Sequence, residues 1–160
     1  TFEGTAADIL TEHVHKDPGG KAFPLGALYA HLIFSEDVII QSMLQGKAPL
    51  SETSYKGKTG TSEPMPAMDA NWSENNEKWS KTVQVDLQEL RAYAQAVYAA
   101  TDAYVESLTD TDLDTVIDLG DWGKKTVAEL LYSFIIAHTN SLAGELSAIK
   151  GVHGVKGYQF

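Results

Sequence analysis

Cysteine is absent from the 160-residue chain. Its absence excludes disulfides, thiolate zinc sites and cysteine nucleophiles, and it fits a reducing compartment, so we expect a cytoplasmic protein. Long apolar runs are also missing. The longest, 131–137, is interrupted by Ser133 and is far shorter than the roughly 18 apolar residues that span a bilayer. The sequence therefore predicts no membrane partner.

Basic residues are scarce: 12 lysines and arginines stand against 22 acidic residues, which gives a formal charge of −10. A protein that binds nucleic acid usually presents a basic face to neutralise phosphates. The densest basic positions are the pairs Lys56 with Lys58 and Lys124 with Lys125. We therefore expect no nucleic acid and no anionic membrane surface among the partners.

Helical periodicity is the main structural signal. Apolar residues recur at spacings of three and four, which predicts helices over 23–45, 87–108 and 125–150, with weaker helical spacing over 1–14 and a short helix over 73–81. No segment alternates as a sustained strand does, so at most a short strand pair is expected. The sequence predicts a single all-α domain over 1–160, an antiparallel four-helix bundle with a long loop between its second and third helices.

Two helix starts carry a capping-box pattern, in which a capping residue is followed three positions later by glutamate. These are Asp86 with Glu89 and Thr126 with Glu129. Behind the second start, the predicted core stripe of the last helix includes His138, Leu142 and Glu145.

The connection 46–72 lacks periodicity and contains several prolines and glycines. Connections of this length tend to be lids, binding loops or disordered segments. We predict that it is the most mobile part of the chain and lies over one end of the bundle. Trp72 and Trp79 should anchor it by burying aromatic surface.

Two histidines lie within apolar helical segments, His31 in the second predicted helix and His138 in the last. Side chains on separate helices of a bundle can converge on a metal, and neutral imidazoles suit zinc, nickel or iron. The alternative for His138 is a hydrogen-bonded residue of the core. The alternative for His31 is an exposed polar position, because Ser35 and Ser42 lie on the same helix face. His13 and His15 are two residues apart and do not share a helix face, so exposure is expected for both, and His153 is unassigned.

An acidic stretch with Asp110, Asp112, Asp114 and Asp121 resembles the start and end of a calcium loop. The match fails at Thr115, where the loop needs glycine, and at Asp121, where it needs a bidentate glutamate. The pattern therefore favours a solvated acidic helix start.

The segment Gly26-Ala27-Leu28-Tyr29-Ala30-His31-Leu32, followed by Ser35-Glu36-Asp37, resembles the second helix of DinB/YfiT-like proteins. The segment 122–145 and the ending 144–160 resemble their last helix and tail. The resemblance extends over nearly the whole chain, in the right order. It implies a bacterial four-helix bundle, often dimeric, with a metal held by three histidines.

Two of those three ligand positions match His31 and His138, whereas the third falls on Leu142. The resemblance implies metal-dependent S-transferases or isomerases that use a low-molecular-weight thiol such as bacillithiol or mycothiol. Because Leu142 cannot bind a metal, zinc or nickel is expected to bind weakly or not at all. The alternative is a degenerate, non-catalytic module of the same fold that binds a small-molecule ligand or dimerises. A homodimer is expected in either case, whereas hydrolase-like chemistry, the substrate and the catalytic residues stay open.

The start of the chain resembles the end of the family's first helix. A bundle with a shortened first helix would expose an apolar groove, which is unfavourable at about 25 cal/mol per Å². We therefore expect residues before Thr1 in the natural protein, or a partner subunit that covers the groove.

Overall fold

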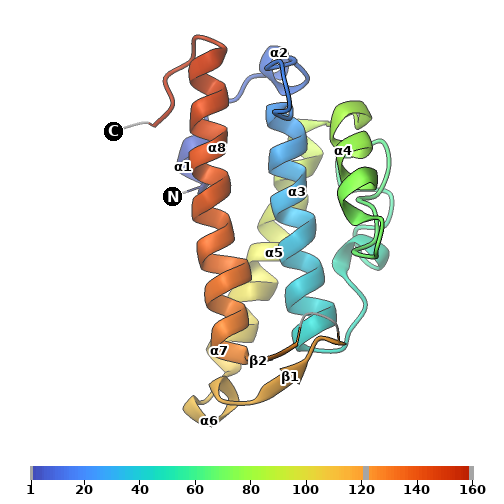
Figure 1. The fold of residues 1–160 in the computed structure, drawn as a ribbon, viewed down its shortest axis with the longest axis vertical. Helices are drawn as coiled ribbons and strands as arrows, with labels where there is room; N and C mark the ends of the chain where they lie inside the picture. The colour runs from blue at the N-terminus through green and yellow to red at the C-terminus, as the bar shows by residue number, and fades with distance from the viewer. Residues whose placement is uncertain (1, 121–122, 159–160) are drawn as a thin grey trace.

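The computed structural model describes residues 2–120 and 123–158, and three long helices dominate it (Figure 1). The first is α3 (Leu25–Asp37), which continues directly into the π-helical segment η1 (Val38–Leu44). The second is α5 (Leu87–Ser107). The third runs through α7 (Val127–Leu130), the π-helical segment η4 (Leu131–Ala137) and α8 (His138–Val152). The predicted all-α class and the three long helices are confirmed.

Shorter elements complete the fold: α1 (Phe2–Ala6), α2 (Thr11–Val14), the 3₁₀ turn η2 (Leu50–Glu52), α4 (Trp72–Thr82) and α6 (Asp110–Leu113). The strands β1 (Val116–Asp118) and β2 (Lys124–Thr126) form the expected short antiparallel pair, with Ile117 opposite Lys125. Asp121 and Trp122, which the sequence assigns to the acidic connector and the start of the last helix, lie outside the described residues.

The capping residues begin the helices where the sequence places them. Thr126 and Glu129 form a complete capping box. At Asp86 the cap is one-sided: the carboxylate accepts from the N–H groups of Gln88 and Glu89, while the N–H of Asp86 donates to the carbonyl of Gly60 at 2.8 Å. The long connection thus takes the role that the sequence assigns to Glu89.

The directions of the helices refine the expected antiparallel bundle (Figure 1). The last helix runs opposite to α3, whereas α3 and α5 run the same way. Contacts near both ends of α3 agree with this direction: Gly26 at its start lies beside Val85, just before α5, and Glu36 near its end accepts a hydrogen bond from Thr101, late in α5. Consecutive helices that run the same way need a long crossover connection, and the segment from η1 to α5, which includes α4, returns the chain along the side of the bundle.

Helix α3 lies at the centre of the fold. Every one of its residues is buried except His31, which is why its sequence is apolar almost all round. α1 packs against α8, and the phenol groups of Tyr29 and Tyr98 donate to the Glu3 carboxylate. Helix α3 is thereby enclosed on most sides. Its one incompletely buried residue is His31, the candidate metal ligand.

The long connection lies along the flank of the bundle rather than over its end (Figure 1). The Asp37 carboxylate, which is 1% exposed, accepts from the N–H groups of Leu50 and Ser51, both at 2.9 Å. Gly60, at φ +75°, packs so closely on the start of α5 that a Cβ would collide with the backbone of Leu90. Trp79 is buried, as expected, and Trp72 is half-buried. The predicted mobility of the connection stays a prediction.

Replacing Asp37 with alanine is expected to lower the free energy of unfolding by about 2–4 kcal/mol. The substitution leaves two N–H groups of the connection and the buried Tyr93 hydroxyl without their acceptor. Urea denaturation would measure the loss, with the exposed Asp114→Ala as the control for removing an acid. A loss below about 1 kcal/mol would show that Asp37 does not hold the connection.

Candidate functional site

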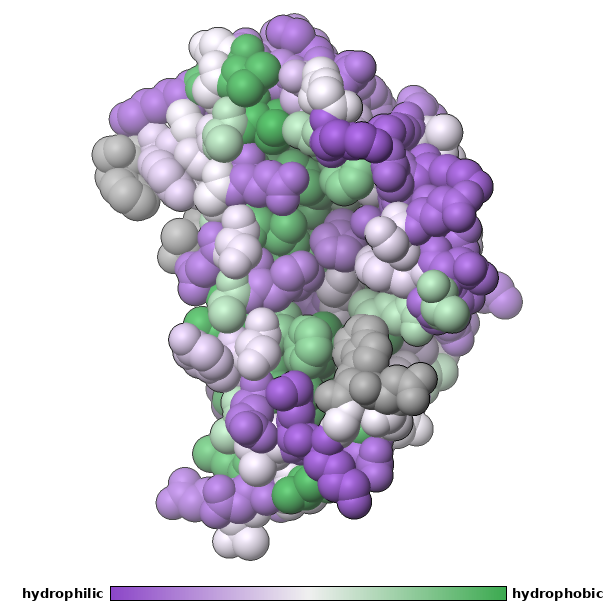
Figure 2. Space-filling view, viewed as in Figure 1, coloured by the Kyte–Doolittle hydropathy of each residue, from purple (hydrophilic) through white to green (hydrophobic). Residues whose placement is uncertain are grey.

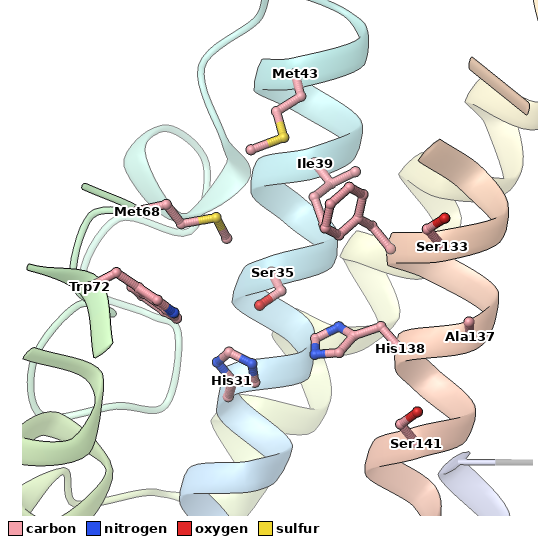
Figure 3. A pocket seen from close by; sticks show the side chains of 11 residues that line it. His31, Ser35, Ile39, Met43, Met68, Trp72, Ser133, Ala137, His138 and Ser141 are labelled. Carbon is pink, nitrogen blue, oxygen red and sulfur yellow. The ribbon is translucent and has the colours of Figure 1, made fainter. Parts of the chain in front are cut away.

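A cavity of about 400 Å³ lies between α3–η1 and the last helix, and its walls are mostly apolar (Figure 3). One wall carries His31, Ser35, Ile39 and Met43; the facing wall carries Phe134 and His138. Met68, from the connection, and Trp72, from the start of α4, flank the side of α3. Such a largely apolar cavity with a few convergent polar groups is typical of small-molecule sites.

His31 and His138 meet in this cavity. Their ring centroids are 5.3 Å apart and the rings stand edge to face. The indole of Trp72 lies on the other side of His31, with the ring centroids 5.8 Å apart. The structure therefore brings together the two histidines that the sequence singles out, although the segments that carry them are about 100 residues apart.

Both imidazoles are electrically neutral near pH 7. Burial, with a contribution from His138, lowers the pKa of His31 to about 4, and burial also lowers the pKa of His138. As the pH falls below 6.5, these histidines are protonated in the unfolded chain but stay neutral in the folded protein. They therefore lower the free energy of unfolding progressively towards pH 4. The neutral rings can each offer one donor and one acceptor to a ligand.

Two buried polar atoms on α3 have no hydrogen-bond partner within the described part of the chain: Nδ1 of His31 and Oγ of Ser35. Ser35 is 3% exposed and lies one helical turn beyond His31, on the same face. Leaving a buried polar group unpaired costs about 1–3 kcal/mol. His31, for which an exposed position was the alternative, is half-buried, and Ser35 beside it is enclosed by the cavity wall.

Each wall includes a π-helical segment. η1 contributes Ile39 and Met43, and η4 contributes Phe134 and Ala137. π-helical turns are rare and occur frequently at functional sites. None of the seven η4 residues is buried, although the segment is strongly apolar. In α8 beyond it, the expected inward position Glu145 is exposed, and Leu146 is buried instead.

The donor set does not fit a metal held by three histidines. Leu142 stands one turn beyond His138 and is 7% exposed within the hydrophobic core. Across residues 2–120 and 123–158, no third histidine, aspartate or glutamate joins His31 and His138 in a metal-binding group. Two imidazoles alone leave a zinc ion short of the three or four protein ligands that its sites provide.

The other candidate residues are used elsewhere. His15 is exposed, as expected, and its Nε2 accepts a hydrogen bond from the N–H of Val85 at 2.8 Å. For His13 the expected exposure is wrong, since only 15% of its side chain is exposed. Asp112 forms a capping box with Thr109, and that hydrogen bond lowers the pKa of the carboxyl. This supports the acidic helix start over a calcium loop.

Sequence reasoning missed Met43, Met68 and Trp72 as cavity residues. Trp72 was expected only as an anchor. Ser35 carried a usable signal, because its spacing of four from His31 places both on one helix face. Met68 carried none, since its approach to α3 depends on the path of the connection.

The hydropathy of the surface differs between the two sides of the site (Figure 2). Hydrophilic side chains cover the α4 side of this face, while apolar side chains show in the recess beside the last helix. In the part of the chain that the structure describes, no helix combines the length and apolarity needed to cross a bilayer.

Comparison with known proteins places the fold and the family. The sequence profile of the DinB superfamily matches residues 1–141. A crystal structure of a conserved protein from Enterococcus faecalis superimposes with a TM-score of 0.76 at 24% identity, and the match covers 94% of this chain and 87% of that one. No curated protein matches the chain. Since the profile spans most of the sequence, the chain belongs to the DinB superfamily.

Proposed function

We propose that this protein binds a small, mostly apolar molecule in the cavity between α3 and the last helix, with one hydrogen-bonding group of that molecule against Ser35 and His31. The observation that carries the proposal is the pair of buried, unpartnered atoms, Oγ of Ser35 and Nδ1 of His31, on a cavity wall that is otherwise apolar. A ligand hydroxyl can donate to one and accept from the other.

The surroundings support an aromatic ligand. Trp72 and the two imidazoles offer flat faces and edges on which a ring can pack. Met43 and Met68 are flexible and polarizable, and such side chains adapt to ligands of different shapes. Specificity would come from the polar pair and affinity from the apolar walls.

The second candidate is the metal-dependent thiol transferase that the family resemblance implies. The convergence of His31 and His138 favours it. Leu142 weighs against it, because this buried leucine occupies the third ligand position. Metal-free binding of a small molecule is therefore the better supported function, because it uses the apolar walls and the unpaired polar atoms and needs no third metal ligand.

Replacing Ser35 with alanine separates ligand binding from stability. We expect the variant to bind 1-naphthol about threefold to tenfold more weakly, because a hydrogen bond is lost. Its affinity for 1-methylnaphthalene, which lacks the hydroxyl, should not change. The variant should also be more stable than the natural chain, by up to about 1 kcal/mol, since it no longer buries an unpaired hydroxyl.

NMR titration would measure both affinities, and urea denaturation the stability. Ser141→Ala is the matched control, because Ser141 lines the same cavity but is exposed. The proposal would be refuted if Ser35→Ala lost affinity for 1-naphthol and 1-methylnaphthalene equally, or if neither compound bound to the natural chain.

A further inference from the structure

A second cavity, of about 830 Å³, lies beneath the long connection on the neighbouring face of α3 and η1. The helix presents His31, Ser35 and Ile39 to the first cavity and Phe34, Val38 and Ser42 to the second. The two cavities are therefore separated by little more than the width of one helix face.

Met68 lines both cavities. It extends from the connection towards α3, beside Trp72 (Figure 3). A methionine side chain has three rotatable bonds, so it can move aside without a change in the backbone. The junction between the two cavities is thus formed by a side chain that can open it.

The second cavity differs from the first in chemistry. Its walls include the hydroxyls of Thr59, Thr61 and Ser62 and the charged groups of Glu52, Lys56 and Glu63. Two carboxylates against one ammonium group favour a cationic or hydrogen-bond-donating ligand, and the chain's formal charge of −10 adds to that preference. Among the residues that the structure describes, the lining of the first cavity includes no acidic or basic side chain other than its two histidines.

We propose that the two cavities form one bipartite site. Its ligand has an aromatic head in the first cavity, the histidine cavity that contains His31 and His138, and an arm bearing hydroxyl and ammonium groups in the second cavity, under the connection. The proposal rests on the proposed function, since the head occupies the same place. Met68 marks the point where the arm leaves the head.

The three methionines of the chain report on this site separately. Met43 lines only the histidine cavity, Met65 only the second cavity, and Met68 both. With ¹³C-labelled methionine methyl groups, 1-naphthol should shift the signals of Met43 and Met68 but leave Met65 unchanged. Propranolol, a naphthyl ether whose arm carries a hydroxyl and a secondary ammonium group, should shift all three. Single Met→Leu variants assign the signals.

The charge of the arm provides a second test. Propranolol should bind at least about fivefold more tightly than 1-naphthoxyacetate, which has the same head and a carboxylate arm. In the Glu52→Gln/Glu63→Gln variant this preference should vanish or reverse, because only Lys56 stays charged, while 1-naphthol should bind as before. Glu74→Gln/Glu77→Gln on α4 is the matched control, since it removes the same charge from residues that line neither cavity.

The outcomes separate the two proposals. If 1-naphthol shifts Met43 but propranolol leaves Met65 unmoved, or if the arm's charge makes no difference, the bipartite site is refuted and the proposed function stands. If no naphthyl compound shifts Met43, the proposed function itself fails.

Discussion

Replacing Leu142 with histidine is expected to make the stability of this protein depend on zinc or nickel. The new imidazole would stand one helical turn beyond His138, where two ring nitrogens can reach one ion, and His31 already faces His138 across the cavity. The variant would thereby place a histidine at the third ligand position that the family resemblance implies.

The expected changes have opposite signs. Without metal, the substitution should lower stability by about 1–3 kcal/mol, because a buried leucine is replaced by a polar ring. Metal at a hundredfold excess over its dissociation constant should add about 2.7 kcal/mol. For a domain of this size, that gain corresponds to a rise in Tm of about 5–10 °C.

Thermal unfolding with and without metal, for the natural chain and the variant, checks this result. The control is a second variant, Leu142→His with His31→Phe, which removes one ligand and should lose most of the metal effect. If Leu142→His gains no metal-dependent stability, the cavity does not have the geometry of a metal site, and the enzyme candidate loses its main support.

Replacing Lys150 with methionine should be among the most damaging single changes in the chain. Lys150 is 0% exposed, and its ammonium group donates to the carbonyls of Thr5 and Gly157 and to the carboxylate of Asp8. One buried charge therefore joins the start of the chain, α8 and the C-terminal segment. Methionine keeps the apolar stem but removes all three hydrogen bonds.

The expected loss in the free energy of unfolding is about 2–4 kcal/mol, discounted because the Asp8 side chain is 41% exposed. Hydrogen bonding and charge attraction from Lys150 lower the pKa of Asp8. The contribution of this pair is therefore present above about pH 4 and is lost as the pH falls through the lowered pKa. The difference in stability between Lys150→Met and the natural chain should therefore shrink under acid, to the part that the two carbonyls contribute.

Urea denaturation at several pH values measures both effects, with Lys16→Met as the exposed control. If the difference in the free energy of unfolding did not shrink in acid, Asp8 would contribute little, and the hydrogen bonds to the two carbonyls would account for the loss of stability.

The sequence alone determined the positions of the helices, because the signals for them are local. Periodic apolar residues and the caps at Asp86 and Thr126 act within a few residues of each other, and the structure has helices starting at Leu87 and Val127. The sequence also identified His31 and His138, since a histidine within an apolar stripe is conspicuous without any knowledge of its neighbours.

Only the tertiary structure decided how those helices make a site. The parallel run of α3 and α5 results from the return path of the connection, and this path places Met68 and Trp72 beside α3. Whether Ser35 is exposed or enclosed depends on the facing helix, some 100 residues away. Burial and hydrogen-bond partnership are properties of such long-range contacts, and no local pattern of residues encodes them.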